Sequence, residues 1–278
     1  MKDMEPKKEG RTTFKKYFKI FLHLQKIGLM NRATYRVNFV ILLFAVFLQM
    51  FFNLVFINVI FGFLDNIAGW TYHEALIIVA TYMLIDGFLW IFTAHLASLV
   101  RHIKEGTLDG ILVKPIDGQF LVSFWRGDIE DIVRISTGIF ILVYALINLG
   151  ATLGADLFLN IFLYLILLFN ALIIGYSLSF FLKTVSFWVI EGRAFFHLSD
   201  TLFRISQYPT DIFYHSIVRI LVSSIVPLAF MATVPAKILA RGFDLWLIVG
   251  SFAVAGVFFV GSRKFFQFAL KHYSSASS

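Results

Sequence analysis

Four polar side chains recur on one helical face within an apolar stretch, residues 185–206. Arg193, His197, Asp200 and Arg204 follow the spacing i, i+4, i+7 and i+11, which places them along one side of an α-helix. Charged side chains inside a membrane cost roughly 2.5–3.5 kcal/mol each, so they are usually paired and often functional. Such a stripe can face the interior of a helix bundle, or it can act on lipids at headgroup level. We take Arg193, His197 and Asp200 as candidates for a polar pathway or a contact between subunits.

A single acid, Asp86, interrupts a second apolar stretch, residues 75–100. Such an acid predicts either a partner side chain or a polar cavity, which would add Asp86 to the candidate pathway. The alternative is a protonated carboxyl that hydrogen-bonds to a neighbouring helix. We do not predict a cation site here. Asp128, Glu130 and Asp131 differ, because they directly precede the next apolar stretch. Acids at a helix N-terminus complement the helix dipole, so this cluster predicts a helix start rather than acid–base catalysis.

Several catalytic motifs are absent from the sequence. There is no G-x-x-x-x-G-K-[ST], so the chain has no P-loop with which to hydrolyse ATP. His73 and Glu74 are not followed by the second histidine of H-E-x-x-H, and the absence of cysteine excludes a thiolate metal site and a cysteine nucleophile. The sequence therefore predicts no catalytic residue, no metal ligand and no cofactor held by this chain.

The elements that carry these side chains are apolar blocks long enough to cross a membrane. Hydrophobic residues make up 59% of the 278 residues and charged residues 15%, whereas soluble domains have about 25% charged residues. About twenty apolar residues in a helix cross the ~30 Å hydrocarbon core of a bilayer. We predict an all-α integral membrane protein with six transmembrane helices in a domain of residues 37–262. Five of them are expected at roughly 37–63, 75–100, 132–153, 157–182 and 243–261.

The remaining region, residues 183–242, leaves the fifth span open. Residues 185–206 are apolar but carry the polar stripe, whereas residues 212–235 are apolar but interrupted by Pro227 and Pro235. Composition alone favours 212–235 as the span. The stripe would then belong to a cytoplasmic interfacial helix.

The distribution of lysine and arginine predicts the orientation. The N-terminal segment 1–36, the polar segment 101–131 and the tail 263–278 are rich in these residues, whereas the turns at 64–74 and 154–156 have none. Positive charges mark the cytoplasmic side, so both termini are predicted to be cytoplasmic. The net charge of +7 flanks the apolar blocks, which fits attraction to anionic membrane lipids and gives no indication of nucleic-acid binding.

Within the N-terminal segment, residues 12–36 interleave aromatic and aliphatic side chains with lysines and arginines. This pattern predicts a basic amphipathic helix in the membrane interface, with its aromatic side chains towards the lipid. A disordered basic tail is the alternative.

The segment 105–115, between the second and third predicted spans, has the pattern of a short amphipathic helix. Thr107 is a plausible N-cap, Leu108, Ile111 and Leu112 form one apolar face, and Pro115 ends the turn. A helix of this kind that projects into the cytoplasm can dock a soluble partner. On spacing alone, an ordinary surface helix fits equally well.

The pattern Gly-Thr-Leu-x-x-Ile-Leu-x-x-Pro after the second span resembles the coupling segment of ABC-2 type transporter permeases. The order of the other features is similar to that family over nearly the whole chain. Three further motifs resemble a bacterial branch formerly described as a domain of unknown function: Ser186-Phe187-Trp188, Tyr208-Pro209 and the proline-containing run from Val226 to Ala236. The resemblance implies that 185–206 is the fifth span and that 207–240 form a re-entrant hairpin before the last span.

The resemblance also implies a function. The chain would be a permease subunit of the bacterial cytoplasmic (inner) membrane, not an enzyme, and would export a lipophilic, drug-like or lipid-linked substrate. Two ATP-binding subunits would hold the ATP and Mg, and a second permease, identical or a sister chain, would complete the pathway. The residues expected to couple to the ATP-binding subunit are Gly106, Thr107, Leu108, Ile111, Leu112 and Pro115. A membrane-embedded lipid-modifying enzyme, with the stripe at headgroup level, is the alternative.

Overall fold

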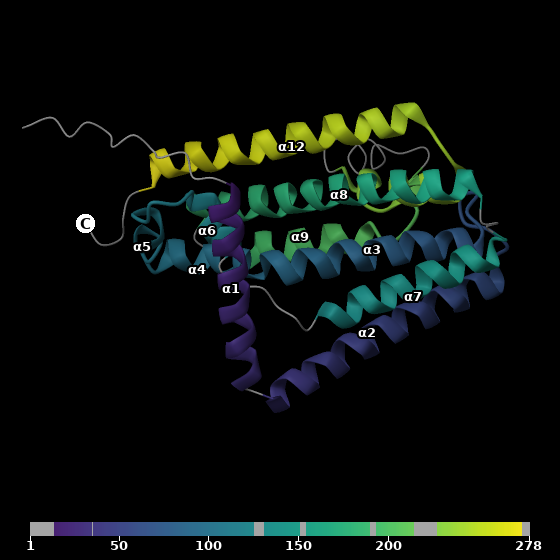
Figure 1. Ribbon diagram of the computed structural model, residues 1–278, viewed down its shortest axis with the longest axis horizontal. Helices are drawn as coiled ribbons and strands as arrows, with labels where there is room; N and C mark the ends of the chain where they lie inside the picture. The colour runs from purple at the N-terminus through teal and green to yellow at the C-terminus, as the bar shows by residue number, and fades with distance from the viewer. Residues whose placement is uncertain are drawn as a thin grey trace, which may run out of the picture.

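The computed structural model describes residues 14–34, 36–124, 131–150, 154–189, 193–213 and 227–273, and the predicted all-helical architecture is confirmed over these ranges. The long helices run alongside one another in one bundle (Figure 1). They are α2 (Arg36–Phe63), α3 (Tyr72–Thr93), α7 (Ile132–Asn148), α8 (Ala155–Thr184) and α12 (Leu245–His272).

Four helical stretches in the described residues are long and apolar enough to cross a membrane. They are Val40–Phe63, Tyr72–Lys104, Ala155–Phe187 and Leu245–His272, and they correspond to four of the predicted spans. The predicted span 132–153 is shorter than expected, because α7 ends at Asn148. Gly150 follows at φ +69°, a left-handed conformation that commonly terminates helices.

The region of the fifth span contains only short helices among the described residues. They are η3 (Val185–Phe187), α9 (Arg193–Ile205), η4 (Thr210–Phe213), η6 (Leu228–Phe230) and α11 (Thr233–Arg241). The 13 residues of α9 extend about 20 Å, less than the ~30 Å hydrocarbon core. Much of the competing candidate, 212–235, lies outside the described residues, so six spans remain a prediction.

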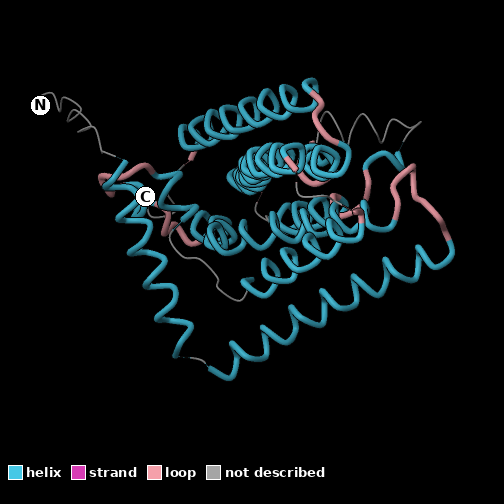
Figure 2. Tube along the Cα trace, turned by 45° about the vertical axis from the view of Figure 1, so that its right-hand side comes forward, coloured by secondary structure: helices cyan, strands magenta, loops and turns pink. Residues whose placement is uncertain are grey.

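A set of short helices gathers at one end of the bundle. These are η1 (Ala94–Ser98), α4 (Leu99–Lys104), α5 (Asp109–Leu112) and α6 (Gly118–Phe124). At the same end, α1 (Phe14–Thr34) lies across the direction of the long helices (Figure 1). The helix predicted within residues 12–36 is therefore present over these bounds, and its place in the membrane interface remains a prediction. Figure 2 shows α1 and α2 meeting at an angle, with α2 at the edge of the bundle.

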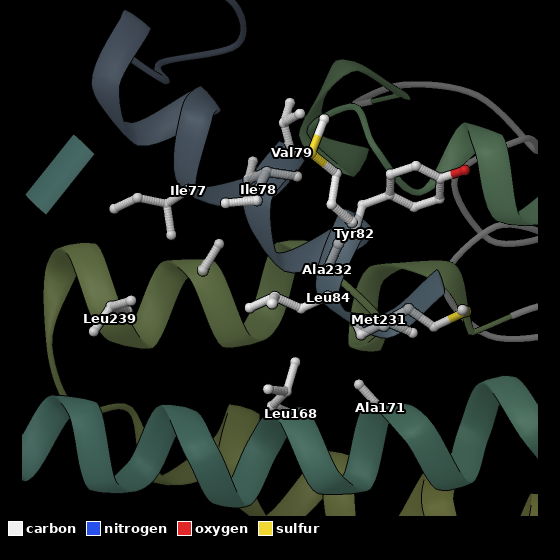
Figure 3. Packing of buried hydrophobic residues seen from close by; sticks show 14 of the residues in the cluster. Ile77, Ile78, Val79, Tyr82, Leu84, Leu168, Ala171, Met231, Ala232 and Leu239 are labelled. Atoms are coloured by element: carbon white, nitrogen blue, oxygen red, sulfur yellow. The ribbon is translucent and has the colours of Figure 1, made fainter. Parts of the chain in front are cut away.

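The core of the bundle surrounds α3. Every residue of α3 from Ala75 to Leu89 is buried except Phe88, and side chains of α8 and of residues 227–241 pack against it (Figure 3). Two glycines let α3 and α7 approach closely. A Cβ atom on Gly87 would lie 2.7 Å from Ile135 Cγ1, and one on Gly138 would lie 3.1 Å from the Ala80 carbonyl oxygen. The α3–α7 pair is thus closely packed, and it positions the polar side chains Asp86 and Arg134.

Candidate functional site

The buried arginine Arg134, in the first turn of α7, joins three helices. Its guanidinium forms an ion pair with Asp86 of α3 and contacts Asp131 at 3.3 Å from Nε to Oδ1. It also donates from Nη2 to Gln49 Oε1 of α2 over 3.4 Å. Because the side chains of Arg134 and Asp86 are only 11% and 8% exposed, each charge is compensated inside the protein rather than by water.

Two cavities adjoin this ion pair. The larger, of about 240 Å³, lies between α2, α3, α7 and α9, and the smaller, of about 30 Å³, lies between α3, α8 and α9. Asp86, Trp90 and Asp200 line both cavities. Charged and aromatic side chains dominate the larger one, which is lined by Val46, Tyr82, Asp86, Trp90, Asp131, Arg134, Asp200 and Arg204.

The charged residues that line the two cavities balance in number. Three are acids and three are bases: Asp86, Asp131 and Asp200 against Arg134, Lys183 and Arg204. Polar cavities of this size admit several water molecules, and intramembrane charges commonly mark a substrate or ion pathway. We call these six residues the charge cluster. Its carboxylates can accept hydrogen bonds, and its basic side chains can donate them, to a polar group that enters the bundle.

The predicted coupling segment has a different character, because its apolar face is covered by the chain itself. Leu108 is 0% exposed and Ile111 is also buried, and Leu112 packs against the same cluster. That cluster includes Phe180 of α8 and Phe266 of α12. The segment therefore packs against two long helices. The side chains that make this contact are the ones predicted from their spacing to share one apolar face.

The helix start within this segment was wrongly predicted. α5 begins at Asp109 and its N-cap position is Leu108, not Thr107. The Thr107 hydroxyl instead lies 2.8 Å from His102 Nδ1, and Gly106 makes the preceding turn at φ +66°, a conformation that glycine adopts without strain. Pro115 lies beyond the end of α5 at Leu112, as predicted.

The outer surface of the coupling segment is formed by other residues. Val113 is 81% exposed, and Glu105, Gly110 and Pro115 are exposed too. Tyr273, just after α12, reaches the inner side of the segment. Partial burial, together with the neighbouring Asp109 carboxylate, raises the pKa of the Tyr273 hydroxyl. Val113 is thus an exposed apolar side chain on the face of the segment that the chain itself does not cover.

The sequence profile of the ABC-2 family transporter protein matches residues 47–277. This match covers all the long helices except the first part of α2, the charge cluster and the coupling segment. The chain belongs to the ABC-2 family of transporter proteins. Neither a curated protein nor a solved structure matched the chain. The predicted family is thereby confirmed, and with the apolar helices it identifies a multi-pass membrane protein.

In this ABC-2 protein the predicted pathway residues are only partly brought together. Asp86 and Asp200 share both cavities, and the ion pair with Arg134 decides between the alternatives for Asp86 in favour of a charged partner. Arg193 and His197 belong to α9, but their side chains lie outside the described part of the structure. No role for these four residues follows from placement alone.

Sequence reasoning missed Arg134 and Lys183. Both lie near the end of an apolar block, where basic residues usually reach towards the membrane surface, so neither was distinguished from the flanking positive charges. The available signal was the isolated acid itself, because a buried carboxylate requires a basic partner on a neighbouring helix. The identity of that partner depended on the packing of α3 against α7.

A second polar network closes the opposite end of the ABC-2 bundle. Trp70 Nε1 donates to Asp211 Oδ2 over 2.8 Å. The Arg241 guanidinium lies 4.3 Å from the centroid of the Trp70 ring and pairs with Glu74 at 2.9 Å. The turn at 64–74, η4 and the end of α11 therefore lie at the same end of the molecule, away from the coupling segment.

Proposed function

We propose that this ABC-2 family protein is the permease subunit of an ATP-driven exporter of a lipophilic, drug-like or lipid-linked substrate. Two copies of a separate ATP-binding subunit would supply ATP hydrolysis with Mg, and a second permease, identical or a sister chain, would complete the pathway. The observation that carries the proposal is the family match over residues 47–277. Family membership favours this function over that of a lipid-modifying enzyme.

The packing of the coupling segment supports a mechanical role. Leu108 and Ile111 join the segment to Phe180 of α8 and Phe266 of α12 through one buried cluster. Because packed cores transmit displacement rather than absorb it, a partner that moves the exposed side of the segment would move both long helices. Apart from Gly106, which makes the turn before α5, the predicted coupling residues therefore fall into two groups. Leu108, Ile111 and Leu112 anchor the segment, while Thr107, Pro115 and the added Val113 face the partner.

The path of the chain around α9 supports a six-span arrangement with 185–206 as the fifth span. Trp188 stacks on Phe265 and Phe268 near the end of α12, whereas Asp211 bonds to Trp70 at the opposite end. The chain thus passes from one end of the bundle to the other between these residues. The basic segments support a proposed orientation with both termini on the cytoplasmic side of the inner membrane and with α1 in the interface.

The charge cluster supports a polar passage inside the bundle. Its balance of acids and bases is suited to a substrate headgroup or to water, and its position next to α9 would make it respond to movement of that helix. We propose that Asp86 and Asp200 contribute to this passage, and we extend the proposal to Arg193 and His197 because they share the helical face of Asp200.

Co-purification of the tagged chain tests the proposal. An ATP-binding subunit should accompany it in mild detergent, and Val113→Asp should abolish that association because it places a charge in the docked surface. Phe243→Asp is the matched control, since Phe243 is 60% exposed in the loop before α12, at the other end of the bundle. A chain that purifies alone would favour the alternative function, a lipid-modifying enzyme. Equal association of both variants would exclude the docking surface.

A further inference from the structure

A larger cavity lies across α3 from the charge cluster, and it shares Leu89 and Thr93 with the smaller of the two polar cavities. It has a volume of about 740 Å³ and is walled by α1, α3, α6, α8 and α12. Its wall is almost entirely apolar and rich in phenylalanine, with Phe21, Phe88, Phe92, Phe120, Phe124, Phe169 and Phe259 among the lining residues. Ligand sites in proteins commonly have volumes of roughly 300–1,000 Å³, so this cavity is of the size that holds a ligand.

The cavity continues along the seam between α8 and α12. A neighbouring apolar cavity of about 590 Å³ shares Phe169, Ile173 and Phe259 with it, and reaches Phe162 of α8. From Phe162 to Tyr176 the two cavities follow 15 residues of α8, or about 21 Å of helix. One leaflet contributes about half of the ~30 Å hydrocarbon thickness. We call the two cavities together the aromatic groove, and it is long enough for an acyl chain of one leaflet.

One end of the aromatic groove is polar. Among its described lining residues the charged ones are Asp117 and Arg263, which pair at 2.9 Å and are 30% and 46% exposed. The pair presents one negative and one positive group side by side to a ligand. A headgroup that carries charges of both signs complements it, whereas a purely anionic headgroup would also face the Asp117 carboxylate.

Gln119 adds an unsatisfied acceptor at this end. The residue is 6% exposed, and its Nε2 donates to the Tyr176 hydroxyl over 3.1 Å. Its Oε1 is buried and has no hydrogen-bond partner within the described structure. A buried acceptor without a partner costs about 1–3 kcal/mol, so a donor on a bound molecule would be stabilised here. The groove therefore combines an apolar channel, a zwitterion-compatible ion pair and a site for a hydrogen-bond donor.

We propose that the aromatic groove binds one phospholipid whose zwitterionic headgroup ends in a primary ammonium, of the phosphatidylethanolamine class. The acyl chain occupies the seam between α8 and α12, the phosphate contacts Arg263, and the ammonium donates to Asp117 and to Gln119 Oε1. The lipid belongs to the leaflet on the side of the coupling segment. The site depends neither on ATP nor on a partner subunit, so its failure would leave the proposed transport function untouched.

Photolabelling in nanodiscs tests this site. The full chain is reconstituted with a phosphatidylethanolamine that carries a diazirine in its acyl chain, and the labelled peptides are measured by mass spectrometry. We expect adducts within residues 162–176 and 252–263. Gly256→Leu should lower the labelling about tenfold, because Gly256 lines the groove and a Cβ there meets no atom within 4 Å. The added side chain therefore fills the groove without a clash.

Gly261→Leu is the matched control, since Gly261 is also exposed on α12 with open space at its Cβ and does not line the groove. Equal labelling of the two variants would overturn the proposal. So would the absence of lipid adducts from residues 162–176 and 252–263 in the unaltered chain.

The headgroup is tested by competition. Unlabelled phosphatidylethanolamine should displace the probe at least about fivefold better than phosphatidylcholine, whose quaternary ammonium cannot donate a hydrogen bond. Gln119→Glu should widen this preference, because a carboxylate accepts a stronger hydrogen bond than an amide oxygen and only the primary ammonium can donate one, a gain that misfolding cannot produce. Gln119→Leu should reduce it, because only the donation to Asp117 remains. Equal competition by both lipids in the unaltered chain would overturn the headgroup assignment.

Discussion

The ion pairs Arg134–Asp86 and Arg263–Asp117 join the same two residue types in opposite surroundings. The side chains of the first pair are 11% and 8% exposed, and those of the second are 46% and 30% exposed. The first holds α3 and α7 together within the charge cluster, whereas the second borders an apolar groove. Burial makes the first pair a requirement of the fold, and exposure leaves the second free to exchange partners with a ligand or with water.

Removal of the buried arginine should have the largest effect. Arg134→Met leaves the Asp86 carboxylate without its base, and breaking a buried pair in this way costs about 3–5 kcal/mol. The expected result is a sharply lower melting temperature of the purified chain in detergent. Asp86→Leu combined with Arg134→Met should regain much of the loss, because both charges are removed together. A single variant as stable as the unaltered chain would contradict the comparison.

The exposed pair should matter much less to stability. Arg263→Gln is expected to cost about 0–1 kcal/mol, the usual range for exposed ion pairs. The difference should vanish in 1 M salt, where the screening length is about 3 Å, while the deficit of Arg134→Met persists. Melting curves at low and high salt measure both variants. A salt-independent loss at Arg263 equal to that at Arg134 would remove the distinction between the two pairs.

The smallest change in stability is expected within the aromatic groove. Phe169 is 63% exposed, so Phe169→Ala should alter the free energy of unfolding by about 0.5 kcal/mol or less. It should nevertheless reduce lipid photolabelling, because Phe169 lines both parts of the groove. Phe158→Ala is the control, as Phe158 is 65% exposed on the same helix and lines neither part. Equal labelling of these two variants would show that Phe169 does not contribute to lipid binding in the groove.

Hydropathy predicted the long helices well, because membrane-spanning blocks are defined by composition over about twenty residues. It could not place the region around α9. Arg193, Asp200 and Arg204 lower the hydropathy of that stretch, and only tertiary packing shows that charges of α9 face Asp86 and Arg134. The end of α7 was also missed, since the sequence around Gly150 is apolar and the positive φ at that glycine is a local conformational choice.

The coupling segment shows a different limit of sequence reasoning. The periodicity of Leu108, Ile111 and Leu112 correctly predicts one apolar face, but periodicity does not say what covers it. In the structure the cover is the chain's own α8 and α12, so the surface available to a partner is the other one, at Val113. The aromatic groove was missed for a related reason, because phenylalanines that line a groove and phenylalanines that face lipid have the same pattern.

The attachment of α1 has a consequence for biosynthesis. The backbone N–H of Asp117, just before α6, donates to the Tyr17 hydroxyl over 3.3 Å, and the Tyr17 ring packs edge-on against Phe120. Tyr17 is synthesised 100 residues before Asp117, which at translation rates of about 5–20 residues per second is an interval of roughly 5–20 s. During that interval the docking site of α1 does not exist. The contacts that fix α1 against α6 therefore form late in synthesis, after the first helix and the span that follows it have left the ribosome.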